Sequence, residues 1–135
     1  MTTIVTPKVE SLTDRIDIRP LLFVSDIQRS ISFYCERLGF TLEGEAKSQG
    51  RIFWCRLSRQ GCSIMLQQEE EEDRPFDQRG KGIVFYFVCK DADVIYQEFT
   101  ERGLSLRPPT TAYYGMRQIH VAEPDGYNLC FESPV

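Results

Sequence analysis

Apolar residues recur at helical spacing in the segment 23–40, which reads FVSDIQRSISFYCERLGF. Four of them are spaced so that a helix would bring them to one face. They are Ile27, Ile31, Tyr34 and Leu38. Ser25 or Asp26 stands where an N-cap is expected, and Gly39 stands where a left-handed residue commonly ends a helix. The pattern therefore predicts an amphipathic helix that follows directly on the end of a strand.

The same order of residue types returns in the segment 87–104, which reads FVCKDADVIYQEFTERGL. Phe23 and Phe87 are 64 residues apart (87 − 23), and so are Gly39 and Gly103 (103 − 39). A constant spacing that covers a strand end and a helix indicates a duplicated supersecondary unit.

Short alternating segments follow each predicted helix, which is the signature of strands. They are 40–46, 52–57 and 62–67 in the first half and 104–107, 116–122 and 127–132 in the second. Each half is therefore predicted to be a βαβββ module. The chain then divides, within one structural domain, into an N-terminal extension at 1–17, a first module at 18–67, an acidic linker at 68–82 and a second module at 83–135.

Two motifs carry a resemblance to a known family. DIQRSISFYCERLGF has the pattern D-x-x-x-S-x-x-F-Y-x-x-x-L-G-F, and YYGMRQIHVAEPDGYNLCFESP contains a late P-D-G turn. Both resemble the vicinal oxygen chelate superfamily, which includes glyoxalase I, the extradiol dioxygenases and the bleomycin-resistance proteins. The resemblance covers residues 18–134. It implies an α+β fold, the glyoxalase/bleomycin resistance fold, in which two βαβββ modules form a cup-shaped, eight-stranded mixed sheet.

Enzymes of this superfamily hold a divalent metal in the cup, with one ligand from the first strand and one from the last strand of each module. The matching positions here are Arg19, Met65, Ile83 and Cys130. Arg and Ile offer no lone pair to a cation, and Met and Cys are soft ligands that suit copper(I). We therefore expect no metal site of the family type and no cofactor.

Strand alternation divides the predicted strands into a face toward the helices and a face toward the cup. The residues expected to face the helices are Leu22, Val24, Ile64, Leu66, Val84, Tyr86, Leu129 and Phe131. The candidate ligand-binding residues, on the cup face or at its rim, are Arg19, Met65, Phe85, Tyr113, Tyr114, Met116, Gln118, His120, Cys130 and Glu132. This mainly apolar set with a few polar groups is the usual composition of a small-molecule site.

Several of these residues have two interpretations. His120 is the chain's one histidine, so a multi-histidine metal site is excluded. It is either a hydrogen-bonding or pH-sensitive ligand contact or a sheet histidine with no special role. Tyr113, Tyr114 and Trp54 either stack on a planar or cationic ligand or complete the core or a dimer interface. Cys130 and His120 have no recognisable nucleophile motif around them.

Composition narrows the classes of partner. The 135 residues carry 16 basic and 20 acidic side chains, and the net charge of −4 argues against a nucleic-acid partner. No apolar run approaches the roughly 18 residues of a membrane span, and the first residues lack the pattern of a signal peptide. The five cysteines form no CxxC pair and are interpreted as reduced thiols. We expect a cytoplasmic protein with no membrane partner.

The function implied by the resemblance is ligand sequestration. A small, acidic chain without metal ligands is similar to the bleomycin-resistance proteins, which bind their drug in clefts at a homodimer interface. The leading hypothesis is therefore a metal-independent homodimer that sequesters a planar or cationic organic molecule. Two alternatives stay open: a divalent-metal lyase or dioxygenase with displaced ligands, and a structural dimer whose cup is filled by Phe53, Met65 and Phe85.

Overall fold

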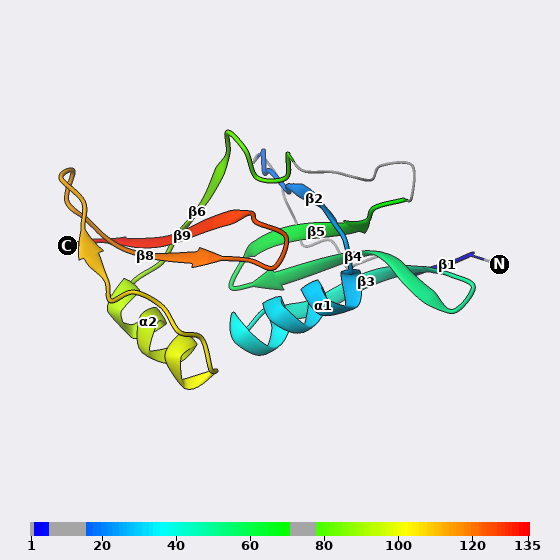
Figure 1. The fold of residues 1–135 in the computed structure, drawn as a ribbon, viewed down its shortest axis with the longest axis horizontal. Coiled ribbons are helices and arrows are strands. Elements are labelled where there is room, and N and C mark those ends of the chain that lie inside the picture. Colours follow the sequence, from blue (N-terminus) through cyan, green and yellow to red (C-terminus); the bar gives the residue numbers. More distant parts are fainter. Residues whose placement is uncertain (1, 6–15, 71–77) are drawn as a thin grey trace. The chain divides into compact units, whose positions relative to one another are not determined.

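The chain folds into two compact units, residues 1–76 and 77–135, which are shown as a ribbon in Figure 1. The computed structural model describes residues 2–5, 16–70 and 78–135, and for 2–5 it gives the strand backbone. Residues 1 and 6–15 of the predicted extension and residues 71–77 of the predicted acidic linker lie outside the described residues. Each unit is described by itself.

The first unit is a mixed sheet with one helical segment. Its elements are β1 (Thr2–Val5), β2 (Leu21–Val24), α1 (Ile27–Ser32), η1 (Phe33–Arg37), β3 (Thr41–Ser48), β4 (Arg51–Arg59) and β5 (Cys62–Gln68). The strand order is β1-β3-β4-β5-β2, with β2 and β5 parallel and the other pairs antiparallel. Strand β1 lies in the segment 1–17, which the sequence predicted as an extension, and it pairs with β3.

The second unit repeats this plan with fewer strands. Its elements are β6 (Val84–Val88), α2 (Ala92–Glu101), β7 (Thr110–Thr111), β8 (Met116–Ala122) and β9 (Asn128–Pro134). The order is β6-β9-β8-β7, and β6 and β9 are the parallel pair. The predicted α+β class and the two βαβββ modules are confirmed, with the strands forming a five-stranded and a four-stranded sheet.

One predicted strand is wrong. The segment 104–107 is not a strand, and the short strand β7 begins at Thr110, after Pro108 and Pro109. Proline has no N–H to donate to a sheet, so ladder pairing with β8 starts only beyond the two prolines. This leaves 104–109 as an extended segment beside the sheet, which matters for the site described below.

Each helix packs against one face of its sheet through a buried aromatic residue. In the first unit Tyr34 is fully buried together with Leu38, Leu57 and Leu66. In the second unit Phe99 is fully buried and meets Phe131 edge to face, with ring centroids 5.0 Å apart. Phe131 in turn stacks on Phe87 at 4.6 Å. Burial of such side chains supplies most of the stability of a small domain.

The two helices begin in the same way. Asp26 and Asp91 are the N-caps, and their side chains accept from backbone N–H groups of the first turn. A side chain at the end of the last strand accepts from the first helical N–H: Gln68 Oε1 from Ile27 N at 2.9 Å, and Ser133 Oγ from Ala92 N at 2.8 Å. These equivalent residues are 65 apart (91 − 26, 133 − 68), not 64.

The two helices end differently, and this explains the change of spacing. In the first unit the helix closes with a π-helical stretch, and Phe40 N donates to Tyr34 O, six residues back. In the second unit Leu104 N donates to Phe99 O, five residues back. The π-helical stretch therefore takes up one extra residue in the first helix. Equivalent residues of the two units are therefore 65 apart before the π-helical stretch and 64 apart at the glycines that follow it.

This extra residue makes the predicted facing of β6 wrong. Phe85 and Phe87 lie on the helix side, where Phe85 contacts Tyr127 and Phe87 contacts Phe131. Val84 and Tyr86 lie on the opposite face and are 45% and 52% exposed. The constant spacing of 64 placed the strand one residue out of phase, and a slip of one residue exchanges the two faces of a strand. Phe85 is thus removed from the cup face.

The remaining facing predictions agree with the burial of the strands. Leu22, Val24, Ile64, Leu66, Leu129 and Phe131 are buried. The parallel pairs are β2 with β5 and β6 with β9, and of these four strands only β6 was assigned the wrong facing. The residues of β9 lie 65 positions after their equivalents in β5, and the facing of β9 was counted from the turn that precedes it.

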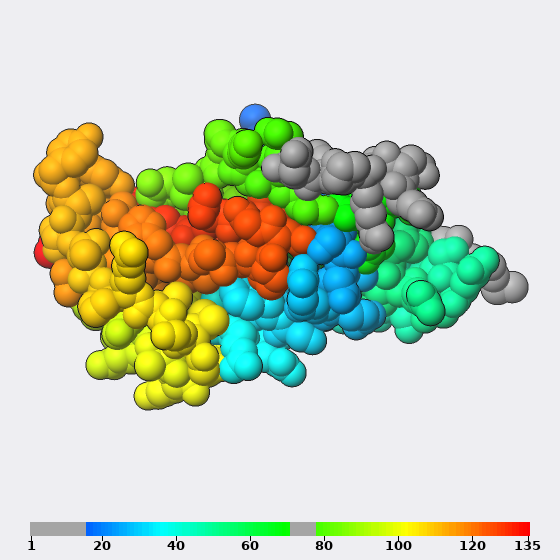
Figure 2. All heavy atoms as spheres, viewed as in Figure 1, coloured from blue at the N-terminus to red at the C-terminus, as the bar shows by residue number. Residues whose placement is uncertain are grey.

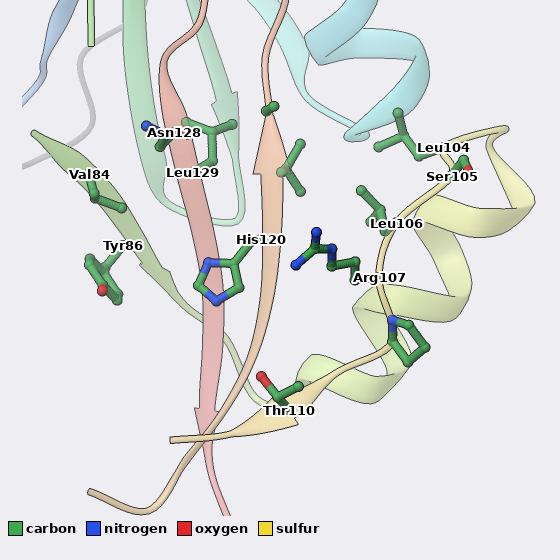
Figure 3. A pocket seen from close by; sticks show the side chains of 13 residues that line it. Val84, Tyr86, Leu104, Ser105, Leu106, Arg107, Thr110, His120, Asn128 and Leu129 are labelled. Atoms are coloured by element: carbon green, nitrogen blue, oxygen red, sulfur yellow. The ribbon is translucent and has the colours of Figure 1, made fainter. Parts of the chain in front are cut away.

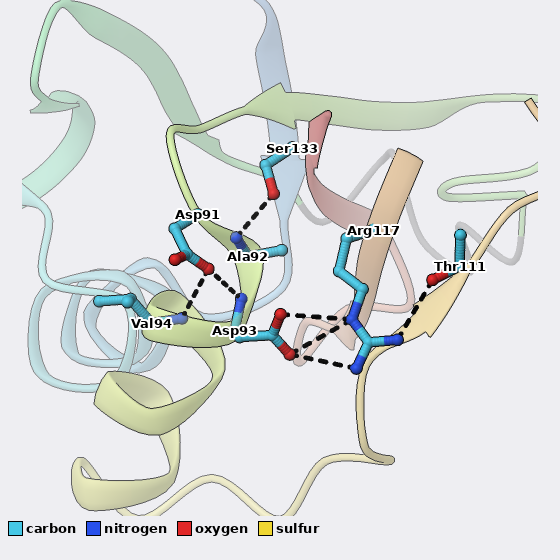
Figure 4. A network of polar contacts seen from close by, with 7 residues as sticks. All are labelled: Asp91, Ala92, Asp93, Val94, Thr111, Arg117 and Ser133. Carbon is cyan, nitrogen blue, oxygen red and sulfur yellow. Dashed lines mark hydrogen bonds and ion pairs between the residues drawn. The ribbon is translucent and has the colours of Figure 1, made fainter. Parts of the chain in front are cut away.

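A polar network fixes the start of α2 against β7, β8 and β9 (Figure 4). Asp91 Oδ1 accepts from Asp93 N and Val94 N, and Asp93 also forms an ion pair with Arg117 of β8 at 3.2 Å. Arg117 Nη1 donates to Thr111 Oγ1 of β7. Because this network holds the two-residue strand β7 beside β8, it also positions the segment that leads into β7.

Among the described residues, no helix is long and apolar enough to cross a membrane.

The segment between β7 and β8, coloured orange in Figure 2, projects from the second unit and carries the fully exposed Tyr113.

Candidate ligand-binding site

A pocket of about 640 Å³ lies in the second unit, between the open face of the sheet and the segment that follows α2 (Figure 3). Strands β6, β8 and β9 contribute one side and residues 104–110 the other. The lining residues are Val84, Tyr86, Leu104, Ser105, Leu106, Arg107, Pro108, Thr110, His120, Val121, Ala122, Asn128 and Leu129. The volume lies in the range of ordinary ligand pockets, about 300–1,000 Å³.

Sheet register explains why these side chains meet. Val84 is opposite Asn128, and Asn128 is opposite Ala122, which makes one row across the open face. Tyr86, Cys130 and His120 form the next row. Residues in one row share a face because side chains alternate along each strand. The apolar and polar side chains of the pocket are therefore positioned by the ladder itself.

An imidazole and a guanidinium point into this space, in addition to the amide of Asn128. In Figure 3 the His120 ring projects from β8, and the Arg107 guanidinium extends from the segment after α2 toward it. Neither side chain forms a hydrogen bond or ion pair with another residue of the described ranges. No aspartate or glutamate is among the lining residues. The pocket thus combines hydrogen-bond donors with apolar walls.

A separate polar cluster lies one row beyond. Gln118 Nε2 donates to Glu132 Oε1 at 2.8 Å and to Tyr114 Oη at 2.7 Å, and Tyr114 Oη donates to Glu132 Oε1 at 3.1 Å. Glu132 is only 9% exposed. Burial of the Tyr114 hydroxyl, followed by its bond to Glu132, raises the pKa of Tyr114. The cluster anchors the projecting segment to the sheet and does not line the pocket.

The cysteine opposite His120 is a poor nucleophile. Burial, with a further contribution from the Glu132 charge, raises the pKa of Cys130 to about 11. The thiolate is the reactive form, so at neutral pH Cys130 is a protonated, buried thiol. Although Cys130 and His120 are opposite each other in the β8–β9 ladder, their surroundings do not favour a Cys–His couple.

The other predicted site residues lie elsewhere. Met116 opens β8 opposite Pro134, and Tyr113 packs edge to face on Tyr114 at the projecting segment. Arg19 and Met65 belong to the first unit, where Met65 N donates to the carbonyl of Pro20. The structure therefore brings Tyr114, Gln118 and Glu132 together in one cluster. Of the residues predicted to bind a ligand, His120 is the one that lines the pocket.

The open face of the first unit is more fully paired. Arg56, on the strand next to Met65, forms an ion pair with Glu43 at 2.9 Å. Hydrogen bonds from Ser58 and then from Arg56 lower the pKa of Glu43. Arg56 is thus neutralised by a carboxylate, unlike Arg107 in the second unit.

Sequence reasoning missed most of the pocket lining. Arg107 and the leucines of 104–106 were missed because 104–107 was predicted as a strand, and Thr110 was assigned to no element. Tyr86 and Val84 were assigned to the helix side by the spacing of 64. A signal for the correct phase is present: the capping aspartates, Asp26 and Asp91, are 65 apart, whereas the glycines after the helices are 64 apart.

Two βαβββ units, each with a helix on one sheet face and the other face open, define the class of protein. The chain belongs to the Glyoxalase/Bleomycin resistance protein/Dioxygenase superfamily, whose sequence model matches residues 14–131. No curated protein matches the chain.

Solved structures with the same fold are similar over most of this chain. A glyoxalase/bleomycin resistance protein/dioxygenase from Nocardioides is 18% identical, with a TM-score of 0.67 over 91% of this chain and 86% of that one. TnmS3, an antibiotic binding protein from Streptomyces sp. CB03234, is 23% identical, with a TM-score of 0.66 over 89% and 98%. Virulence protein STM3117 from Salmonella typhimurium is 26% identical, with a TM-score of 0.62 over 93% and 100%.

The residues at the family's metal positions do not fit a metal. With the spacing of 65, the position matching Arg19 in the second unit is Val84 and not Ile83 (19 + 65), while Met65 still matches Cys130 (65 + 65). A guanidinium and an isopropyl group have no lone pair to give, and the Cys130 thiol is protonated at neutral pH. Within 16–70 and 78–135 no three His, Cys, Asp or Glu side chains gather in a group that could hold a metal.

Proposed function

We propose that this chain is a metal-independent binding protein that sequesters a planar organic molecule, in the manner of the bleomycin-resistance branch of its superfamily. The observation that carries the proposal is the pocket of about 640 Å³ on the open sheet face of the second unit. Tyr86 offers a ring for stacking, Val84 and Leu106 offer apolar walls, and His120 and Asn128 offer hydrogen-bonding groups.

The chemistry of the pocket supports binding over turnover. Nucleophilic catalysis needs an activated side chain with a base beside it, and the pocket lining holds no carboxylate and no ionised thiol. The one imidazole in the lining is that of His120, which has no orienting partner among the described residues. A planar ligand would therefore be held by its surface and released unchanged. TnmS3, named as an antibiotic binding protein, has the same fold.

We also propose that the working form is a homodimer in which a second copy completes the binding cleft. The edge strands of both sheets carry exposed apolar side chains: Leu21, Phe23, Val84, Tyr86 and Val88. Exposed apolar residues along the edge strand of a sheet are typical of interfaces. Light scattering on the purified protein should give twice the 15.7 kDa of one chain, and a monomer at micromolar concentration would contradict this part of the proposal.

The proposed location is a reducing compartment, the cytoplasm. All five cysteines are free thiols, and the pair at the β4–β5 hairpin, Cys55 and Cys62, is unbonded. Disulfides are rare in cytosolic proteins because cellular thiols keep them reduced. Titration of thiols in protein taken directly from cells, under denaturing conditions that block exchange, should count five.

Calorimetry with the full-length chain tests the binding function. The panel contains planar cationic antibiotics of the bleomycin type together with neutral and acidic planar aromatics of similar size. We expect saturable heat for at least one compound, which mass spectrometry then recovers unchanged. Tyr86→Ala should weaken that binding at least fivefold, because it removes the stacking ring, whereas Tyr96→Ala on α2 serves as a matched control outside the lining. Heats no larger than buffer for every compound, or a chemically altered ligand, would overturn the proposal.

A further inference from the structure

We propose that the ligand of this pocket carries an anionic group, a carboxylate on a flat apolar body, and that Arg107 binds it. This inference rests on the proposed binding function and names the class of its ligand. It keeps the planar body and replaces the cationic option, since the expectation from sequence was a planar or cationic molecule. The argument depends on three features of the pocket: its arginine, its lack of acidic side chains, and its apolar walls.

Arg107 is an exposed residue that lines the pocket, where its guanidinium is accessible to a ligand. It lies between α2 and β7, in a segment fixed at one end by the Leu104 N to Phe99 O bond and at the other by the β7–β8 pairing. Its side chain forms no hydrogen bond or ion pair within the described part of the chain, and it lines the pocket. A guanidinium presents planar, paired donors whose geometry matches a carboxylate.

The absence of acidic residues from the lining is informative in this protein. The chain has 20 acidic side chains against 16 basic ones, yet the pocket lining holds Arg107 and no aspartate or glutamate. The nearest carboxylate on the same face by register is Glu132, one row beyond Cys130. Its Oε1 already accepts from Tyr114 and Gln118, and it is nearly buried. A cationic ligand in the pocket would face Arg107 without a counter-charge.

The other lining residues suit the remainder of such a ligand. Val84, Leu104 and Leu106 present aliphatic walls, and Tyr86 presents an aromatic ring. His120 shares the open face with Tyr86, in the row where Cys130 lies between them. A flat ring system placed on this row would extend its acidic end toward Arg107, with His120 as an additional donor.

The first unit supports this reading by contrast. Its face also presents an arginine, Arg56, but that side chain is paired with Glu43 at 2.9 Å and is 7% exposed. An arginine with a carboxylate partner inside the protein has little to offer an anionic ligand. In the second unit Arg107, for which no carboxylate partner is found among the described residues, lines the pocket.

Three probes with the same ring and different charge test the proposal: 2-naphthoate, 2-naphthamide and 2-naphthylmethylammonium. Because His120 is the chain's one histidine, its imidazole proton signals report on binding in this pocket without ambiguity. We expect naphthoate to shift these signals with an affinity at least tenfold higher than naphthamide, since hydrogen bonds to a charged group are stronger than those between neutral groups. The ammonium compound should bind most weakly.

Arg107→Gln should remove the preference for naphthoate and leave the affinity for naphthamide within about twofold. Arg51→Gln, the same change at an exposed arginine of the first unit, should leave all three affinities unchanged. Thermal unfolding of each variant confirms that the fold is retained. Tighter binding of the ammonium compound, or an undiminished preference for naphthoate in Arg107→Gln, would overturn the anion assignment while leaving the binding function intact. If none of the probes moves the His120 signals at millimolar concentration, the binding function proposed for this pocket fails with it.

Discussion

The two units anchor their helices alike and differ in what they leave on the opposite sheet face. In both, an aspartate caps the helix, a side chain from the last strand binds the first helical N–H, and one aromatic residue fills the space beneath the helix. On the open faces, the first unit pairs Arg56 with Glu43, whereas the second has Arg107 and His120 in a pocket. The contacts that make the fold are repeated, and the groups available to a ligand are not.

The largest effect in this comparison is expected from the buried aromatics. Phe99→Ala should lower the free energy of unfolding by about 3–5 kcal/mol, because it leaves a cavity between α2 and Phe131. Tyr34→Ala should cost a similar amount in the first unit. Urea unfolding measures both. A loss below about 1 kcal/mol for either variant would show that the two helices are not packed in the equivalent way described here.

Alkaline pH should weaken the fold through Cys55 on β4. Burial raises the pKa of Cys55 from 9.0 to about 12. Between these values the native protein holds a proton that the unfolded chain has released, so the free energy of unfolding falls as the pH rises. By about pH 10.5 the loss attributable to this thiol should reach about 2 kcal/mol.

Urea unfolding at pH 8 and pH 10.5 measures this loss, with Cys55→Val as the comparison. The valine variant should lose about 2 kcal/mol less than the wild type over the interval, since lysine and tyrosine titration is common to both. In the second unit Cys130→Val should behave similarly, because the pKa of Cys130 is raised to about 11. Equal losses in wild type and Cys55→Val would contradict the protonated, buried thiol.

The bonds between last strand and helix start should have an intermediate effect. Ser133→Ala removes the acceptor of the buried Ala92 N–H and should cost about 1–3 kcal/mol. Gln68→Ala should cost about as much, since Gln68 accepts from Ile27 N and donates to the carbonyl of Ser25. Thermal or urea unfolding gives the values, and Ser133→Thr, which keeps the hydroxyl, is the control. A neutral Ser133→Ala together with a costly Gln68→Ala would break the equivalence of the two anchors.

The smallest effect is expected at the surface of the second unit. Arg117→Gln removes the ion pair with Asp93, whose side chain is 55% exposed. Exposed pairs of this kind contribute about 0.2–1 kcal/mol and are screened by salt. The difference between Arg117→Gln and wild type should therefore shrink in 1 M NaCl. A loss above about 2 kcal/mol that persists in salt would mean that Arg117 holds β7 by more than its charge.

Much of the fold could be predicted from the sequence because its main signals are local. The helical face of Ile27, Tyr34 and Leu38, and the turn at 123–126, depend on residues close together in the chain. What could not be predicted depends on longer-range accommodation. A letter-by-letter match between the halves cannot show that a π-helical stretch has absorbed one residue, and β1 is defined only by its partner β3.

The candidate site was less predictable for the same reason. His120 was placed on the open face because it stands between the apolar Ile119 and Val121, and in the structure it is exposed between these two buried residues. Phe85 was misplaced because its facing was inferred from the other half of the chain. Arg107 stands at the end of an alternating segment that was predicted as a strand, and its place in the pocket follows from the prolines that delay β7 and from the sheet beside it. A residue in such a segment can be assigned to a site only when the register of the neighbouring strands is known.

The π-helical stretch at 33–37 also bears on how such a duplicated chain can change over time. A helix that ends in a wider turn gives an inserted residue somewhere to go without moving the strands that follow it. Copies of an ancestral module can then differ in length while every sheet ladder stays intact. Alignments of duplicated halves should accordingly permit a gap in the helix before they compare the ligand-facing positions.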